Sequence, residues 1–215
     1  MERSDRYPGF FITLEGGEGV GKSTNLRWIQ AWLLERGIDC LCTREPGGTA
    51  LSEKIRSLIL TDSGEPLDST AELLLIFAAR AQHLSEVIKP ALNEGKVVLC
   101  DRFTDSTFAY QGWGQQRDLS AIGELEHLVQ DGLQPDLTLL FDLPTTEGMH
   151  RVRSRNRALD RMEKQKMDFF QRVREGYLQR AAQDPARFVV VDAMQSLPLV
   201  QTQLDTALCE RLKHV

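Results

Sequence analysis

The sequence is poor in cysteine, and its four cysteines form no recognisable metal or redox pattern. Their spacing matches neither a zinc site nor a C-x-x-C pair. Cys40, Cys42 and Cys100 stand in apolar runs, where a reduced, buried thiol is usual. Long hydrophobic segments are also missing: no apolar run approaches the roughly 20 residues that span a bilayer, and the opening MERSDRYPG lacks the apolar core of a signal peptide. We therefore expect a cytoplasmic protein with no membrane partner.

An excess of positive charge is missing too. The formal net charge is −5 at pH 7, so the overall field does not favour binding to nucleic acid or to an anionic membrane. No repeat, low-complexity tract or linker rich in proline, glycine and serine divides the chain. With 41% hydrophobic residues, an ordinary share for a protein with a core, the chain is expected to form a single domain over 1–215.

Short apolar runs alternate with longer segments of helical periodicity. The runs show no clean polar alternation, which is typical of strands covered on both faces. They lie at 10–15, 38–43, 97–101, 137–142 and 187–192. Helices are predicted at 23–36, from about 70 toward 95 with a bend at Pro90, at 120–132 and at about 163–183. This order predicts an α/β fold in three layers, with a parallel sheet wrapped by helices.

A glycine-rich segment, GGEGVGKS, joins the first predicted strand to the first predicted helix, which is the context that a phosphate loop requires. Its glycines allow backbone N–H groups to turn inward around phosphates, and the following helix adds its positive N-terminal end. Lys22 can bridge the transferred phosphoryl group, and the Ser23 hydroxyl can bind Mg²⁺. The residues predicted to bind a nucleoside triphosphate are Gly16, Gly17, Glu18, Gly19, Val20, Gly21, Lys22, Ser23 and Thr24.

Two classes of triphosphate-binding protein lack support in the rest of the sequence. The N/T-K-x-D guanine motif of GTPases is absent. Motor-type ATPases usually end a strand with Asp-Glu, whereas the strand ends here read Cys-Asp-Arg at 100–102 and Phe-Asp-Leu at 141–143. A small kinase fits better, provided that the chain supplies an acceptor site.

Three polar segments could form that acceptor site at the carboxyl side of predicted strands, where open α/β sheets bind ligands. They are REPGGT at 44–49, FAARAQ at 77–82 and DRF at 101–103. In DRF, the aspartate can serve a metal and the arginine can grip a phosphate through its guanidinium fork. Phe77 and Arg80 share a helix face, which offers a ring for stacking and donors for a base edge.

The segment RVRSRNRALDR at 151–161 carries five arginines and one aspartate, a net charge of +4 within an acidic chain. A solvated basic face is the common interpretation of such a run. Its helix-forming and weakly apolar composition also suits a lid that closes arginines over a triphosphate. We favour the lid.

Taken in order, LEGGEGVGKST, TREPGGT, FAARAQ, DRF, AYQG and LDRME resemble the bacterial thymidylate kinase family, from about residue 10 to beyond 190. The resemblance implies a P-loop NTPase fold with a five-stranded parallel sheet, a short arginine-rich lid at about 150–163 and a homodimer. It also implies transfer of the γ-phosphoryl group of ATP to dTMP, with Mg²⁺ as cofactor, giving dTDP and ADP.

The resemblance assigns roles around the phosphates. Lys22 and Ser23 would hold the ATP phosphates and Mg²⁺, Asp101 would join the metal shell, and Arg102 would grip the phosphate of dTMP. Glu18 would point away from the ATP phosphates and accept a hydrogen bond from the 3′-OH of the acceptor sugar.

The acceptor nucleoside would be held by a second group of residues. Phe77 would stack on thymine and Arg80 would donate to its carbonyl oxygen, while Thr107 and Gln111 would complete the reading of the base. Ile76 is the alternative at the ring position, and Phe77 is favoured because it is aromatic and shares a helix face with Arg80. Tyr110 would crowd the sugar and disfavour a ribose 2′-OH.

Four further residues complete the predicted site. Arg44 and Pro46, in the REPGGT segment, belong to the predicted substrate set. The phosphate loop itself contains no arginine. Arg153 and Arg157 of the lid are therefore predicted to neutralise the charge of the transition state.

Two other functions stay open at this point. A kinase of the same fold that acts on another nucleotide, or on a deoxynucleoside, would share the phosphate loop and differ in the base-reading residues. A regulatory protein that binds ATP without transferring phosphate would not need the strand-end aspartate and the lid.

Overall fold

The computed structural model describes residues 7–61, 64–154 and 160–213. Its strands form one parallel sheet in the order β2-β3-β1-β4-β5. They are β1 (Phe10–Glu15), β2 (Cys40–Arg44), β3 (Val97–Asp101), β4 (Leu137–Asp142) and β5 (Phe188–Asp192). The predicted five-stranded parallel sheet is confirmed, and β2 is shifted toward the carboxyl side of the expected range.

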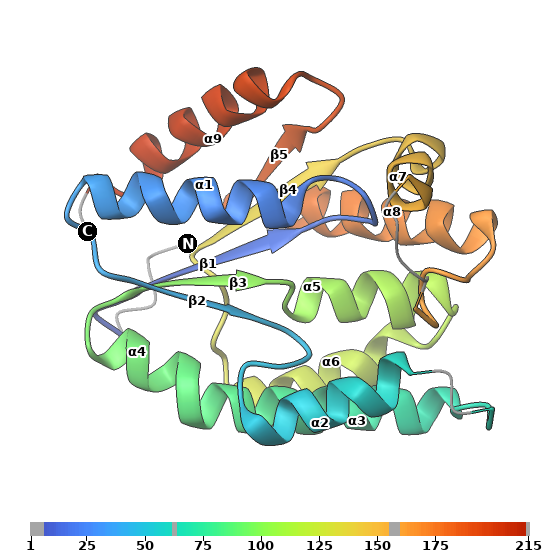
Figure 1. Ribbon diagram of the computed structural model, residues 1–215. Coiled ribbons are helices and arrows are strands. Elements are labelled where there is room, and N and C mark those ends of the chain that lie inside the picture. Colours follow the sequence, from blue (N-terminus) through green and yellow to red (C-terminus); the bar gives the residue numbers. More distant parts are fainter. Residues whose placement is uncertain (1–6, 62–63, 155–159, 214–215) are drawn as a thin grey trace.

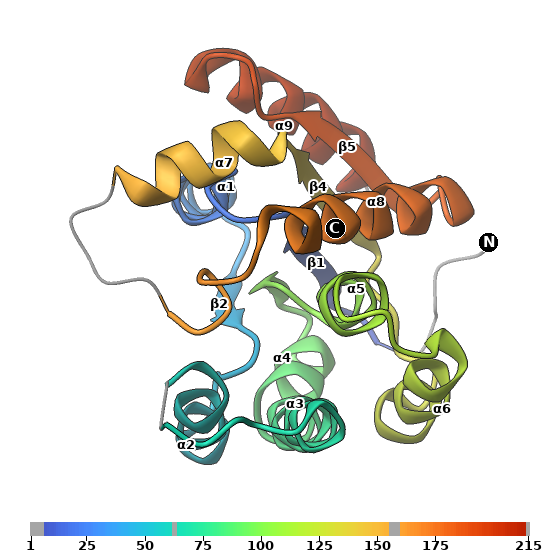
Figure 2. The same ribbon diagram turned by 90° about the vertical axis from the view of Figure 1, so that its right-hand side faces the viewer.

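Helices cover both faces of this sheet, which gives the predicted three layers (Figure 1). One face is covered by α1 (Lys22–Glu35) and α9 (Leu197–Arg211), and the other by α2 (Ala50–Leu60), α3 (Ser69–His83), η1 (Leu84–Ile88), α4 (Lys89–Asn93) and α6 (Leu119–Gln130). Near the carboxyl ends of the strands lie α5 (Thr104–Thr107), η2 (Phe108–Gly114), α7 (Thr145–Arg153) and α8 (Met167–Gln183) (Figure 2). In the described part of the chain, no helix is long and apolar enough to cross a membrane.

The central strand shows why the sequence has no polar alternation. Ile12 and Leu14 of β1 pack in one core cluster with Ile29 of α1 and Leu204 of α9. Phe11 lies in a second cluster with residues of η1 and α4. Because both faces of the strand are buried, apolar residues are needed on both sides.

The periodicity does not predict α2, α5 with η2, α7 or α9, and two of the predicted helices differ in detail. The expected helix from 70 toward 95 is continuous through α3, η1 and α4, and Pro90, which has no N–H to donate, directly follows the π-helical turn η1. The expected helix from 163 begins only at Met167. Before it, the Asp160 carboxylate accepts hydrogen bonds from the backbone N–H groups of Met162 and Glu163, both at 2.9 Å, which holds a turn instead of a helix.

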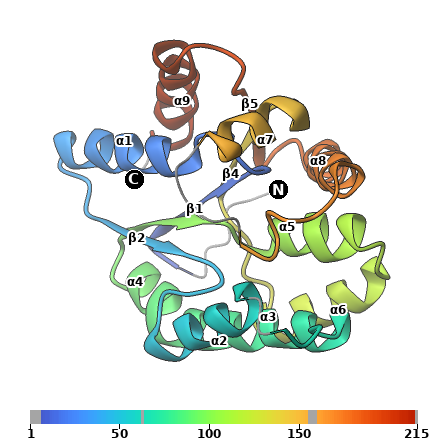
Figure 3. The same ribbon diagram turned by 45° about the vertical axis from the view of Figure 1, so that its right-hand side comes forward.

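The strand order places a crevice beside β1. From β1 the chain passes to β2 on one side of the sheet, and it later reaches β4 on the other side. Open α/β sheets bind ligands at such a point, outside the carboxyl ends of the strands. The loop that joins β1 to α1 lies at this edge, next to α7 (Figure 3).

Candidate functional site

The loop between β1 and α1 is folded as a phosphate loop. Gly16, Gly19 and Gly21 have φ values of 135°, 73° and 93°, which glycine adopts readily. The Lys22 ammonium donates to the carbonyl oxygens of Gly16 and Gly17, each at 2.9 Å. Burial lowers the pKa of Lys22 to about 8. A phosphate in the loop would offer this ammonium a stronger, charged partner than the carbonyls.

The loop touches α7 through a close backbone contact. A Cβ added at Gly19 would lie 2.1 Å from the carbonyl oxygen of Gly148, and a Cβ added at Gly148 would lie 2.4 Å from the carbonyl oxygen of Glu18. Both positions therefore require glycine. Since α7 leads into the arginine-rich segment, this contact joins the phosphate loop to the predicted lid.

Asp101 ends β3 and lines a cavity of about 300 Å³ together with Lys22 and Ser23. Its Oδ1 atom is buried and has no hydrogen-bond partner within the described residues. A buried carboxylate oxygen without a partner is rare and calls for an explanation. Coordination of Mg²⁺ or of a metal-bound water would supply one, because oxygen atoms are the ligands that Mg²⁺ prefers. The two residues predicted for the metal thus fit it chemically.

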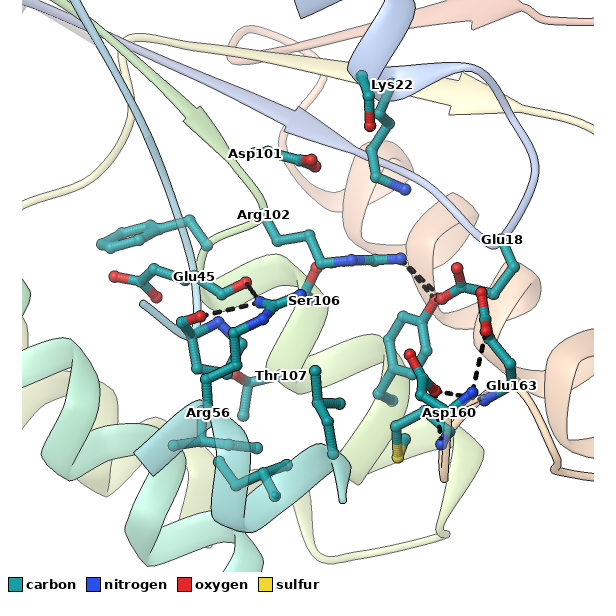
Figure 4. Close-up of a pocket in the computed structure, with 18 of the residues that line it drawn as sticks. Glu18, Lys22, Glu45, Arg56, Asp101, Arg102, Ser106, Thr107, Asp160 and Glu163 are labelled. Carbon is teal, nitrogen blue, oxygen red and sulfur yellow. Dashed lines mark hydrogen bonds and ion pairs between the residues drawn. The ribbon is translucent and has the colours of Figure 1, made fainter. Parts of the chain in front are cut away.

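Arg102 has an uncommon backbone conformation that aims its side chain at the loop. Its φ is 71°, in the left-handed region that is unfavourable for residues other than glycine. Nη1 donates to the Gly16 carbonyl oxygen at 3.0 Å and to the Tyr177 hydroxyl at 2.9 Å. Nη2 donates to Glu18 Oε1 at 2.9 Å. The guanidinium therefore lies between the phosphate loop and the rest of the cavity (Figure 4).

Glu18 points toward Arg102 and away from the α1 end of the loop. Its Oε1 also accepts a hydrogen bond from the Tyr110 hydroxyl at 2.7 Å. In Figure 4, Lys22 and Asp101 lie toward one end of the cavity, and the Glu18 carboxylate faces Arg102. The carboxylate in the loop is thus directed toward the part of the cavity that Arg102 and Tyr110 line.

Next to Arg102 lies the buried carboxyl of Glu15, a residue of the LEGGEGVGKST segment to which the sequence assigned no role. Glu15 accepts hydrogen bonds from the Phe103 backbone N–H at 2.7 Å, the Ser106 hydroxyl at 2.6 Å and the Tyr177 hydroxyl at 3.0 Å. Burial raises its pKa to about 7. Because the two hydroxyls donate to Glu15, their oxygen atoms remain available to accept from Arg102.

Arg80 reaches the cavity from α3 and is held by a buried polar network. Its Nε donates to Glu45 Oε2 at 2.7 Å and its Nη2 to the Thr107 hydroxyl at 3.0 Å. Glu45 Oε1 lies 3.0 Å from His83 Nδ1, and His83 Nε2 lies 2.6 Å from the Thr43 hydroxyl. Arg80 Nη1 is buried without a partner among the described residues, which leaves one fixed donor for a ligand.

The predicted stacking residue does not face the cavity. Phe77 is 2% exposed and packs in a core cluster with Leu73, Phe108 and Ile122. The residue of this turn that lines the cavity is Ile76, one helical turn before Arg80. The prediction that Phe77 stacks on a base is therefore corrected: Ile76 occupies the cavity wall.

A second correction concerns the arginines near REPGGT. Arg44 lies outside the cavity lining and forms a forked pair with Glu53 at the surface, with distances of 3.2 and 2.9 Å. Arg56 of α2 lines the cavity instead, and it donates to the carbonyl oxygen of Pro46 at 2.8 Å. Burial lowers the pKa of Arg56, and within the described residues its side chain bonds only to backbone carbonyls. An anion would therefore be a favourable partner.

Most of the other predicted residues meet at the cavity. They are Glu18, Gly19, Val20, Gly21, Lys22, Ser23, Thr24, Pro46, Arg80, Asp101, Arg102, Thr107, Tyr110 and Gln111. Gly16 and Gly17 belong to the same loop and border a smaller cavity near Arg174 and Tyr177.

The predicted lid is described on both sides of residues 155–159. Arg153 ends α7 with an exposed side chain outside the cavity lining, and Arg157 lies outside the described residues. On the other side of these residues, Asp160, Met162 and Glu163 line the cavity. The segment predicted to be a lid therefore borders the cavity at its carboxyl end.

Known proteins of one family match the chain over nearly its whole length. A family model described as thymidylate kinase matches residues 14–204. The thymidylate kinase of Chromohalobacter salexigens is 58% identical over 206 residues, covering 95% of this chain and 97% of that protein. That of Pseudomonas savastanoi pv. phaseolicola is 56% identical over 205 residues, covering 95% and 97%. The crystal structure of thymidylate kinase from Ehrlichia chaffeensis, 37% identical, matches with a TM-score of 0.75 over 93% of this chain and 98% of that one. The chain therefore belongs to the thymidylate kinase family.

Proposed function

We propose that the protein transfers the γ-phosphoryl group of ATP to dTMP, giving dTDP and ADP. The observation that carries this proposal is one cavity shared by two kinds of group. Lys22 and Ser23 of the phosphate loop line one part, Arg80 and Gln111 line another, and Arg102 reaches between them. Direct transfer needs such a common space for the donor phosphate and the acceptor nucleotide.

On the donor side, the backbone N–H groups of residues 16–24 would surround the ATP phosphates, and Lys22 would exchange its carbonyl partners for phosphoryl oxygens. Ser23 and Asp101 would hold Mg²⁺, whose charge, when bound, neutralises part of the negative charge on the β- and γ-phosphoryl oxygens. The support for this assignment is the buried Asp101 oxygen without a partner and the Ser23 hydroxyl on the same cavity.

On the acceptor side, Arg102 would hold the phosphate of dTMP, with Arg56 as a second guanidinium at the same cavity. The acceptor phosphate is already largely ionised at pH 7, so its oxygen can attack without a general base. Glu18, held by Arg102 and Tyr110, would accept a hydrogen bond from the 3′-OH of the sugar. Tyr110 would leave no room for a ribose 2′-OH.

The base would lie between Ile76 and the polar groups of Arg80, Thr107 and Gln111. Arg80 Nη1 would donate to a carbonyl oxygen of the pyrimidine, which would satisfy its buried donor. Closure of the lid at about 150–163 would exclude water and bring Arg153 or Arg157 to the transferring group, because the loop lacks an arginine.

A homodimer would form through the outer face of α3. Along this helix Leu74, Ala78 and Ala81 are exposed, and small side chains allow a second helix to approach closely. Exposed Leu58 of α2 and Leu128 of α6 lie on the helices that flank α3 (Figure 2). Ala81→Glu should yield a monomer in analytical ultracentrifugation, whereas a dimer unaffected by this change would exclude α3 from the interface.

The proposed activity is tested by ATP consumption with Mg²⁺ against a panel of nucleoside monophosphates and nucleosides, with the product identified. We expect strong formation of dTDP from dTMP, weak use of dUMP and no use of ribonucleotides. Transfer to a different acceptor would keep the kinase assignment and refute the base-reading roles. Binding of ATP without transfer to any acceptor would refute the kinase assignment.

A further inference from the structure

Gln111 is a cavity residue whose amide has one end fixed from behind. It lies in η2 and lines the cavity, and its Nε2 donates to Glu72 Oε1 at 2.8 Å. Glu72 lies on α3, is 1% exposed and stands outside the cavity lining. The amide group of Gln111 therefore faces a buried carboxyl on one side and the cavity on the other.

Glu72 is bound by three donors from two segments of the chain, η2 with its C-cap and the segment that carries Arg161. Its Oε1 also accepts from Gln115 Nε2 at 2.7 Å, and its Oε2 pairs with the guanidinium of Arg161, at the carboxyl end of the predicted lid. Arg161 is itself held by the carbonyl oxygen of Ile59 at 2.7 Å. A guanidinium can only donate, and the oxygen that meets two amide groups must accept from both. The orientation of the Gln111 amide is thus determined, with its NH₂ toward Glu72.

This orientation leaves the Gln111 carbonyl oxygen for a ligand. Within the described residues, Oε1 of Gln111 has no hydrogen-bond partner, and Arg80 Nη1 is a buried donor without one. Together they offer the cavity one acceptor and one donor. The thymine edge carries the complementary pair, a C4 carbonyl oxygen and an N3–H, whereas cytosine presents an amino group and a bare nitrogen at these positions.

We propose that Glu72 is a positioning residue for base selection: by fixing the amide of Gln111, it makes the site accept a pyrimidine with a C4 carbonyl and reject one with a C4 amino group. This inference rests on the proposed dTMP kinase activity. Glu72 acts through Gln111 and does not touch the nucleotide. Its pairing with Arg161 ties the same carboxyl to the end of the lid.

The test compares dTMP with 5-methyl-dCMP, which differs only in the C4 amino group and the unprotonated N3. In Glu72→Gln, the amide oxygen at position 72 should face Arg161, because a guanidinium can only donate hydrogen bonds. The NH₂ group at position 72 should then face Gln111. To accept from it, the Gln111 amide should rotate so that its own NH₂ points into the cavity. The ratio of kcat/KM for dTMP to that for 5-methyl-dCMP should fall on the order of tenfold to a hundredfold, with KM for ATP unchanged. An unchanged ratio, or an equal loss for both nucleotides, would overturn the proposal.

A double-mutant cycle separates positioning from general damage. In a Gln111→Met background, adding Glu72→Gln should not change the ratio of kcat/KM for dTMP to that for 5-methyl-dCMP. The double variant should therefore have the same ratio as Gln111→Met alone. A further fall of the same size as in the wild type would overturn the proposal. Gln115→Met is the matched control, since it removes another donor to Glu72 without reaching the cavity lining, and its ratio should equal that of the wild type.

A second measurement does not depend on a folded variant. Neutron diffraction of the wild-type protein should place the amide deuterons of Gln111 toward Glu72; deuterons directed into the cavity would overturn the proposal. If the wild-type enzyme transfers no phosphate to dTMP, the proposed function fails. If it transfers phosphate and the ratio does not respond to Glu72→Gln, only the role of Glu72 fails.

Discussion

Replacing Glu15 by glutamine is expected to change how the stability of the protein depends on pH. Glu15 is fully buried under the phosphate loop, where Phe103, Ser106 and Tyr177 donate to its carboxyl oxygens. Burial raises its pKa from 4.5 to about 7. Glutamine has nearly the same shape; its oxygen can accept from the backbone N–H, and its NH₂ can donate to the hydroxyls.

The sign of the effect follows from proton binding. Between pH 4.5 and 7, the folded protein keeps the Glu15 proton while the unfolded chain releases it, so this group lowers the free energy of unfolding as pH rises. Above pH 7, Glu15 is ionised in both the folded and the unfolded protein, and its contribution to the free energy of unfolding falls no further. The difference between the two pKa values corresponds to about 3 kcal/mol, of which roughly 2 to 3 kcal/mol falls between pH 5 and pH 8. In the glutamine variant, the side chain at position 15 does not titrate, so the free energy of unfolding lacks this pH-dependent contribution.

The assay is denaturant unfolding of the wild type and Glu15→Gln at several pH values from 5 to 8. The free energy of unfolding of the variant minus that of the wild type should rise by roughly 2 to 3 kcal/mol over this range. Any change in hydrogen bonding adds an offset that does not depend on pH. Glu53→Gln is the control, because Glu53 is at the surface and its pair with Arg44 lowers its pKa. The free energy of unfolding of this variant minus that of the wild type should therefore stay constant above pH 5. If the free energy of unfolding of Glu15→Gln and that of the wild type changed in parallel with pH, the reasoning would be refuted.

Three further predictions test the site. Arg102→Ala should raise KM for dTMP at least about tenfold, with KM for ATP nearly unchanged, because a charge-assisted phosphate contact is lost; unchanged steady-state kinetics would remove this arginine from the acceptor site. Of Arg153→Ala and Arg157→Ala, at least one should lower kcat far more than KM, on the order of a thousandfold for the catalytic finger; wild-type kcat in both would exclude the lid mechanism. Gly148→Ala brings a methyl group within 2.4 Å of a carbonyl oxygen of the phosphate loop and should lower kcat about tenfold, whereas Gly123→Ala, with open space around it, should not.

The sheet and the phosphate loop could be predicted because each is determined by residues that are close together in the sequence. The three central strands, β1, β3 and β4, are buried on both faces and need continuous apolar runs, and each of the five runs is a strand. The loop glycines with positive φ could be read from the spacing of Gly16, Gly21 and Lys22. In α2, by contrast, Leu51 and Leu58 are exposed, so apolar residues do not mark only the buried side of this helix.

The acceptor site could be predicted only in part, because its details depend on helix rotation and on distant partners. Phe77 and Ile76 are neighbours in sequence, and the packing of α3 turns the first into the core and the second into the cavity. Arg56 carries no motif and stands on a helix that the periodicity does not predict. The contact of Glu72 with Gln111 spans 39 residues, and no local pattern records it.

The central claim is that the γ-phosphoryl group passes directly to dTMP within one cavity. The most direct measurement uses ATP labelled in that group, with Mg²⁺ and dTMP, and follows where the label goes during a single turnover. We predict that the label appears in dTDP, with little in inorganic phosphate. Label released as phosphate, whether or not dTMP is present, would contradict the account.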